Sequence, residues 1–141
     1  MVDEAPDDAF RIVEHTADWA VRVRGRDLAE LFGRAATGMV RLLVADPSAV
    51  PLDVERAISL ESYDAEGLLV EWLGELAYLA EREGLVFPII ELDRVMPTGL
   101  SGTVRGGRAL ELQKHIKAVT YHDLAIRRIG SGLEVTIVFD V

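Results

Sequence analysis

The chain has 141 residues, half of them hydrophobic, and 24 acidic against 15 basic side chains give it a formal net charge of −9. This composition fits one folded domain, and the negative field disfavours stable direct binding to nucleic acid while suiting a cation or a basic protein partner. The lack of cysteine excludes disulfides, thiolate metal sites and cysteine nucleophiles.

The start of the chain predicts a tail followed by strands. Residues 1–9 carry four acidic side chains and almost nothing to bury, so we expect a disordered tail before a single domain over residues 10–141. Residues 10–13 are apolar, and residues 19–24 alternate with the period of a half-buried strand. The tail lacks the pattern of a secretion signal, and no apolar run reaches the ~20 residues that span a bilayer. We therefore expect a cytoplasmic protein without membrane contact.

Two helices are predicted from their caps and their apolar spacing. Asp27, with Glu30 three residues later, forms a capping-box pattern, and apolar residues at helical spacing continue to Leu43. Asp64 can cap a second helix, and Gly84 lies just past its end, where a left-handed residue is usual. The second helix is the most strongly periodic segment, so we expect it to pack against a sheet as the central helix.

The remaining segments predict β-structure. Pro88, inside an otherwise apolar segment, indicates an edge strand or a bulge. Runs of strands around two helices favour an α+β fold with a mostly antiparallel sheet. The expected strands are residues 54–62, 86–95, 100–104, a long alternating run within 110–126, and 133–141, with turns at 105–108 and 130–132.

Polar residues near the two ends of the domain are candidates for a metal site. His15 and Asp18 stand before the first regular strand, where they could form a metal or acid/base site, or only a turn in which Asp18 accepts from local backbone N–H groups. Asp140 and the terminal carboxylate of Val141 place two anionic groups within one residue. A divalent cation such as Ca²⁺ or Mg²⁺ would relieve their repulsion, unless the chain end frays and Asp140 is merely solvated.

The segment "KHIKAVTYHD" contains a third candidate, Lys117, among apolar strand residues. Its ammonium could neutralise a nearby carboxylate or meet an acidic group of a partner, or could simply extend from an edge strand into solvent. His115 and His122 fall on opposite faces of a regular strand, so they cannot bind one metal together. The chain has no Walker loop, no dinucleotide fingerprint, no nucleophile elbow and no zinc-protease motif.

Taken together, the segments "EHTADWAVRVRG", "LLVEWLGELAYLAEREGLVF", "IKAVTYHDLAI" and "TIVFDV" resemble the archease family. The order of these segments matches, and the resemblance covers the chain from Phe10 to Val141. It implies a single α+β domain in which two main helices pack with a mostly antiparallel sheet. It also implies a small cytoplasmic protein that is not an enzyme.

The resemblance implies a role beside another protein. Archeases act on the RtcB-type RNA-splicing ligase, which uses GTP and Mn²⁺ to join RNA ends in tRNA splicing and RNA repair. The archease promotes guanylylation of the ligase and allows multiple turnovers. An activator of this kind need not hold RNA itself, and an acidic protein could address a basic surface of the ligase.

The resemblance also implies which residues carry the function. The family's cation site, described with calcium, corresponds here to Asp18, Asp140 and Val141, with Mg²⁺ or Mn²⁺ as other possible ions. Lys117 corresponds to a residue important for activation, and His15 belongs to the same N-terminal motif as a metal-proximal candidate. If this is correct, Asp18 and Val141 lie close to one cation, so the two ends of the domain must meet.

Two other functions stay open from the sequence. The chain could be a general chaperone-like binding module for several RNA-modifying enzymes. It could also be a metal-dependent hydrolase that uses Asp18, Asp140 and Lys117, although no convincing general base accompanies them.

Overall fold

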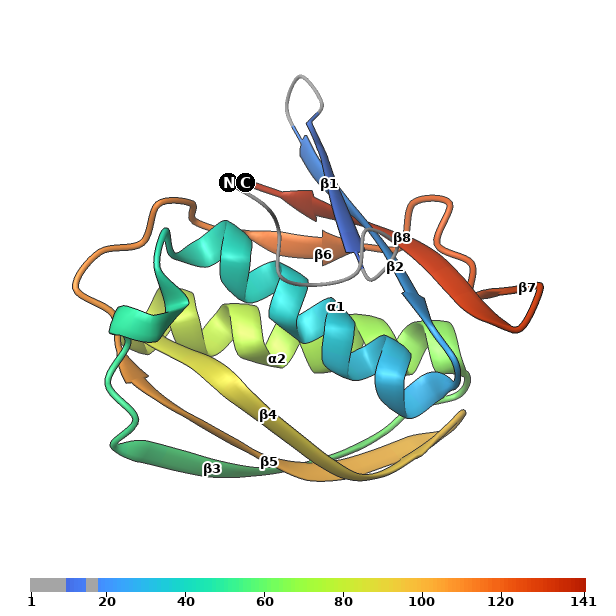
Figure 1. Cartoon of the computed structure of the whole chain (residues 1–141), viewed down its shortest axis with the longest axis horizontal. Helices are drawn as coiled ribbons and strands as arrows, with labels where there is room; N and C mark the ends of the chain where they lie inside the picture. Colours follow the sequence, from blue (N-terminus) through green and yellow to red (C-terminus); the bar gives the residue numbers. More distant parts are fainter. Residues whose placement is uncertain (1–9, 15–17) are drawn as a thin grey trace.

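Two helices lie between two antiparallel sheets in the computed structural model of the chain (Figure 1). The structure describes residues 10–14 and 18–141, and for Phe10, Val13, Glu14 and Asp18 it describes the backbone alone. The predictions for residues 1–9 and for His15 lie outside the described residues. The α+β class and the two helices are confirmed, whereas the strands form two sheets rather than one.

The helices begin and end where the sequence predicts. Helix α1 (Leu28–Leu43) is capped by Asp27, whose side chain accepts from the Glu30 backbone N–H at 2.9 Å. Helix α2 (Ala65–Glu83) is capped by Asp64 and ends at Gly84, which has a φ of 71° and donates to the Ala80 carbonyl. Within the described residues, neither helix is long and apolar enough to cross a membrane.

The core fills both sides of the helix layer. Trp72 of α2 is fully buried, and its indole N–H donates to the Phe32 carbonyl oxygen of α1 at 3.0 Å. Because sheets cover the helices from both sides, α2 buries residues all along its length rather than on one narrow stripe. Helix α2 packs against a sheet as predicted, but it is not more central than α1, because both helices lie in the layer between the two sheets (Figure 1). Its buried residues are Gly67, Leu68, Leu69, Trp72, Leu73, Leu76, Ala77, Leu79 and Ala80.

The five-stranded sheet is organised around its last strand. Strand β8 pairs with β2 along one edge, and with β6 and β7 in succession along the other, while β1 pairs with β2. Its inner face is made by alternate residues such as Val21, Ile137 and Phe139, which are fully buried. The strands are β1 (Phe10–Glu14), β2 (Asp18–Gly25), β6 (Ala118–Thr120), β7 (Arg127–Ile129) and β8 (Gly132–Asp140).

The three-stranded sheet covers the other side of the helices, with the order β3-β5-β4 (Figure 1). A register shift between Val86 and Ile89 shows that Pro88 marks a bulge, as expected for a residue without a backbone N–H. A short 3₁₀ helix, η1 (Pro47–Ala49), precedes the sheet. The strands are β3 (Val54–Glu61), β4 (Leu85–Met96) and β5 (Gly99–Arg108).

The predicted turn at residues 105–108 is wrong, because this segment is the end of β5. A Cβ on Gly106 would lie 1.9 Å from the Val86 carbonyl oxygen, and one on Gly107 would lie 2.5 Å from the Pro51 carbonyl oxygen. The two glycines therefore allow neighbouring backbones to come close, and they do not reverse the chain.

The long strand predicted within residues 110–126 is also wrong, because only β6 is regular there. The preceding loop is held by single backbone bonds, among them Gln113 N–H to the Leu43 carbonyl at 2.8 Å. Ile116, just before β6, is buried, so the apolar residues of this segment anchor a loop to the core. Alternating polarity over a short apolar stretch does not distinguish a regular strand from a loop whose apolar residues are anchored in the core.

Candidate functional site

The register of the five-stranded sheet brings two predicted site residues together. Asp18, at the start of β2, is the direct partner of Asp140, at the end of β8. The predicted cation site requires the two ends of the domain to meet, and their backbones meet at this pair. Asp140 is exposed, whereas the preceding Phe139 is fully buried, so Asp140 lies on the outer face of the sheet.

Lys117 joins the same pair from the other side. Its backbone N–H donates to the Asp140 carbonyl oxygen at 2.7 Å, and the next residue, Ala118, is the β6 partner of Asp140. The Lys117 side chain is exposed, in agreement with a residue that reaches solvent or a partner. Asp18, Asp140 and Lys117 therefore come from three strands or their margins and meet at one end of the sheet.

The end of the chain is held in place. Asp140 is bonded within the sheet on both sides, and the partly buried Val141 packs against the hydrophobic core. The backbone pairing argues against a frayed end, whereas the exposed Asp140 side chain leaves the alternative of a solvated carboxylate open.

The donor set at this position suits a hard cation. Opposed positions of an antiparallel ladder share a face and have Cβ atoms roughly 4.5–5.5 Å apart, so Asp18 and Asp140 occupy positions from which two carboxylates can reach one ion. Oxygen donors without sulfur favour Ca²⁺, Mg²⁺ or Mn²⁺ over soft metals. Among the described side chains, which include neither His15 nor that of Asp18, no cluster of three or more candidate ligands forms.

The two other histidines contact different carboxylates. His115 Nδ1 lies 3.0 Å from Glu81 Oε1, and His122 Nε2 lies 3.2 Å from its neighbour Asp123. Both histidines are exposed. The prediction placed both histidines on one regular strand, but neither lies within β6.

Lys114 is a neighbour of the site that the sequence pattern did not reveal. Its ammonium lies 3.8 Å from the centroid of the Trp19 ring, and Trp19 directly follows Asp18 and is the partner of Phe139. A cation over an indole face is attracted to it and holds the loop against the sheet. The pairing depends on a long-range contact, so no local signal in "KHIK" could have shown it.

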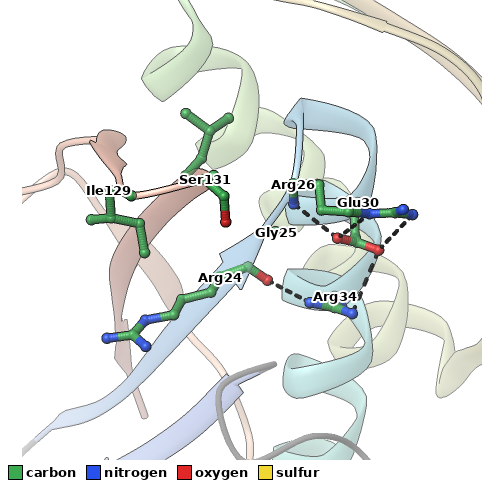
Figure 2. A pocket seen from close by; sticks show the side chains of 10 residues that line it. Arg24, Gly25, Arg26, Glu30, Arg34, Ile129 and Ser131 are labelled. Atoms are coloured by element: carbon green, nitrogen blue, oxygen red, sulfur yellow. Dashed lines mark hydrogen bonds and ion pairs between the residues drawn. The ribbon is translucent and has the colours of Figure 1, made fainter.

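A cavity of about 490 Å³ lies at the opposite end of β2 (Figure 2). Glu30 lies between Arg26 and Arg34, with oxygen–nitrogen distances of 3.2 and 3.5 Å. The Arg26 backbone N–H that donates to Glu30 holds the pKa of this carboxyl below its ordinary value, against the effect of burial, and both guanidinium groups add to that shift. The cavity is lined by Arg24, Gly25, Arg26, Glu30, Arg34, Ile129, Gly130, Ser131, Gly132 and Leu133.

The fold and the paired aspartates define a small α+β protein with a candidate cation site at one end of the five-stranded sheet. The family model of the archease protein family matches residues 10–141. The chain therefore belongs to the archease family, as the sequence segments indicated.

Relatives and solved structures agree with this assignment. The archease of Archaeoglobus fulgidus is 34% identical over 136 residues, covering 94% of this chain and 98% of the relative. That of Methanosarcina barkeri is 31% identical over 140 residues, covering 94% and 95%. The solution structure of protein 1598 from Methanobacterium thermoautotrophicum has a TM-score of 0.76 at 27% identity and covers 95% of this chain and 99% of that one.

A crystal structure from Thermotoga maritima, described as an archease and possible chaperone, has a TM-score of 0.63 at 25% identity. It covers 92% of this chain and 94% of that one. The two solved structures confirm the fold class.

Proposed function

We propose that this chain is a non-catalytic, metal-binding activator of a GTP-dependent RtcB-type RNA ligase. In this role it promotes guanylylation of the ligase and multiple turnovers in tRNA splicing or RNA repair, and it works with the ligase in the cytoplasm. Membership of the archease family supports the proposal. The observation that carries it is the pairing of Asp18 with Asp140, to which Lys117 is bound through its backbone.

The proposed ligands are the carboxylates of Asp18 and Asp140 and an oxygen of Val141, with His15 close by. Ca²⁺ is the proposed ion, and Mg²⁺ and Mn²⁺ prefer the same oxygen donors. The ion would supply positive charge that offsets the repulsion of the paired carboxylates and attracts phosphate oxygens. The chain itself contributes a rigid support, because both aspartates belong to strands of one ladder.

Lys117 supplies a second positive charge beside the pair. Its exposed ammonium can meet a phosphate of the nucleotide in the ligase pocket or an acidic side chain of the ligase. Phosphoryl transfer depends strongly on charges that are already in position, so an activator can act by completing the electrostatic surroundings of the triphosphate. The proposal assigns no bond-making step to this chain.

The test is a guanylylation assay with the cognate ligase, GTP and Mn²⁺, with and without this protein. We expect the wild-type protein to raise the rate of ligase–GMP formation and Asp140→Asn to lose this effect. Asp93→Asn removes an exposed carboxylate from β4 and is the matched control. Wild-type stimulation by Asp140→Asn, or no stimulation by the wild-type protein, contradicts the proposal. Nucleotide hydrolysis by the protein alone would contradict its non-catalytic part.

A second candidate function is a general chaperone-like module for RNA-modifying enzymes. The description of the Thermotoga maritima protein as a possible chaperone favours it. Affinity capture from cell extract separates the two, because a dedicated activator recovers the ligase in stoichiometric amount, whereas a general chaperone recovers several RNA-modifying enzymes at comparable levels.

A further inference from the structure

Arginines gather on the outer face of the five-stranded sheet. Arg11 of β1 is the direct partner of Arg22 of β2. Two residues further along β2, Arg24 is the partner of Glu134 in β8, and Arg127 of β7 is the partner of Glu134 from the other side. Opposed residues and residues two apart share a face, so these four arginines form one surface, which we call the arginine face.

The arginine face points away from the core. Val21 and Val23, which alternate with Arg22 along β2, are fully buried under the helices, so Arg22 and Arg24 belong to the opposite side of the sheet. Arg11 and Arg127 are exposed, and Arg22 is partly exposed.

Ion pairs among the described residues neutralise only one of the four arginines on this face. Arg24 is paired with Glu134, with Nε and Oε2 2.5 Å apart. In the part of the chain that the structure describes, no carboxylate forms an ion pair with Arg11, Arg22 or Arg127. The net charge of −9 does not cancel this, because exposed charges more than about 8 Å apart are largely screened at physiological salt. A polyanion near the sheet therefore meets a locally positive surface.

We propose that the arginine face binds the phosphate backbone of single-stranded RNA, and this inference rests on the proposed function, which brings RNA ends to the same ligase. The guanidinium group matches phosphate geometry. The residues paired with Arg22 and Arg24 are Arg11, Thr136 and Glu134, and Arg127 lies beyond Glu134, so this part of the face offers charge and hydrogen-bonding groups without an apolar anchor. Contacts to phosphate carry no sequence information directly, so binding is independent of base sequence.

The charged residues on the outer side of β2 change from acidic at one end to basic at the other. The outer side of β2 runs from Asp18 to Arg24, and the strand covers about 23 Å at ~3.3 Å per residue. Beyond Arg24, whose carbonyl oxygen accepts from Arg34 at 3.0 Å, the cavity holds Arg26 and Arg34, and both are paired with Glu30 (Figure 2). RNA is therefore held at the arginine end of the strand and kept from the paired aspartates at the other.

The test is fluorescence anisotropy of a short labelled oligouridylate with the full chain at several salt concentrations. Three unpaired arginines predict a slope of log K against log salt of about −2, at ~0.7 per phosphate contact. At 0.1 M salt this makes each contact worth about a fivefold change in Kd, so Arg22→Gln weakens binding about fivefold and the double variant Arg11→Gln/Arg22→Gln about 25-fold. Arg22→Lys keeps the charge and retains binding, which separates loss of contact from misfolding.

Arg105→Gln is the matched control, because Arg105 is an exposed arginine of β5, the central strand of the other sheet. We expect it to bind RNA as the wild-type protein does. Equal weakening by Arg105→Gln and Arg22→Gln, or no binding by the wild-type protein at low salt, overturns the inference. Guanylylation of the ligase in the absence of RNA separates the RNA-binding inference from the proposed function. Asp140→Asn should reduce this guanylylation, and Arg22→Gln should not. If Arg22→Gln instead reduces guanylylation and leaves RNA binding unchanged, the face docks the ligase and the inference is wrong.

Discussion

The indole N–H of Trp72 donates to the carbonyl oxygen of Phe32 at 3.0 Å, inside the layer between the two sheets. This bond ties α2 to α1 where no water reaches, because both side chains are fully buried. A long-range polar contact therefore adds to the apolar packing that sets the relative position of the two helices.

Trp72→Phe should destabilise the fold measurably. The change removes the donor and part of the ring volume, and we expect a loss of about 2–4 kcal/mol in the free energy of unfolding. Urea unfolding followed by circular dichroism measures it. Tyr78→Phe, on the exposed side of the same helix, is the control and should change stability by less than about 0.5 kcal/mol. Similar stability of Trp72→Phe and the wild-type protein would show that the buried bond contributes little.

Gly106→Ala should also destabilise the fold, because its Cβ would lie 1.9 Å from the Val86 carbonyl oxygen in the adjacent strand. Relief requires the paired backbones to separate, and we expect a cost of at least about 2 kcal/mol. Gly74→Ala is the control, because a Cβ there meets nothing within 4 Å and alanine favours helix over glycine by roughly 0.5–1 kcal/mol. Thermal unfolding should show opposite shifts in Tm. A loss of stability in both variants would contradict the backbone argument.

Glu30 should make a pH-dependent contribution to stability. Its pKa is lowered in the folded chain, so the ionised form stabilises the fold at neutral pH, and this stabilisation is lost as the pH falls through the depressed pKa. Glu30→Gln should therefore lower the free energy of unfolding by about 0.5–1 kcal/mol at neutral pH and have little effect in acid. Denaturant titrations across this range measure the difference. A constant difference at all pH values would exclude charge as the cause.

Calcium should stabilise the chain if the proposed cation site is correct. A ligand that binds only the folded state raises stability by about 2.7 kcal/mol at a concentration one hundred times its Kd. We expect added Ca²⁺ to raise Tm and a chelator to reverse it, with both effects absent in Asp140→Asn. Isothermal titration then gives the stoichiometry, for which one ion per chain is expected. Equal calcium binding by Asp140→Asn and the wild-type protein would place the ion elsewhere.

The sequence predicted most reliably what is determined locally. Asp27, Asp64 and Gly84 satisfy backbone groups within a few residues of themselves, so the helix limits follow from short patterns. The division of the strands into two sheets depends on partners far along the chain, and period-2 spacing does not encode it. The glycines at 106 and 107 illustrate this, because their closest neighbours are Val86 and Pro51 rather than turn residues.

The sequence predicted the residues of the candidate site but not the long-range contacts that bring them together. The resemblance named Asp18, Asp140 and Lys117, and the ladder now places their backbones together. No spacing rule could show that Lys117 donates to the Asp140 carbonyl, because that contact joins a loop to a distant strand. The roles of these residues in cation binding and activation stay predictions that the variants above test.

Strand β8 also determines when the five-stranded sheet can form during synthesis. It supplies the central partner of β2 and the sole β-ladder partner of β6 and β7 among the described strands, yet it follows all of them along the chain. Until β8 leaves the ribosome, β2 has an open edge, and Asp18 has no partner at position 140. The proposed site is therefore assembled only after β8 has joined the sheet, so a nascent chain without β8 lacks the aspartate pair.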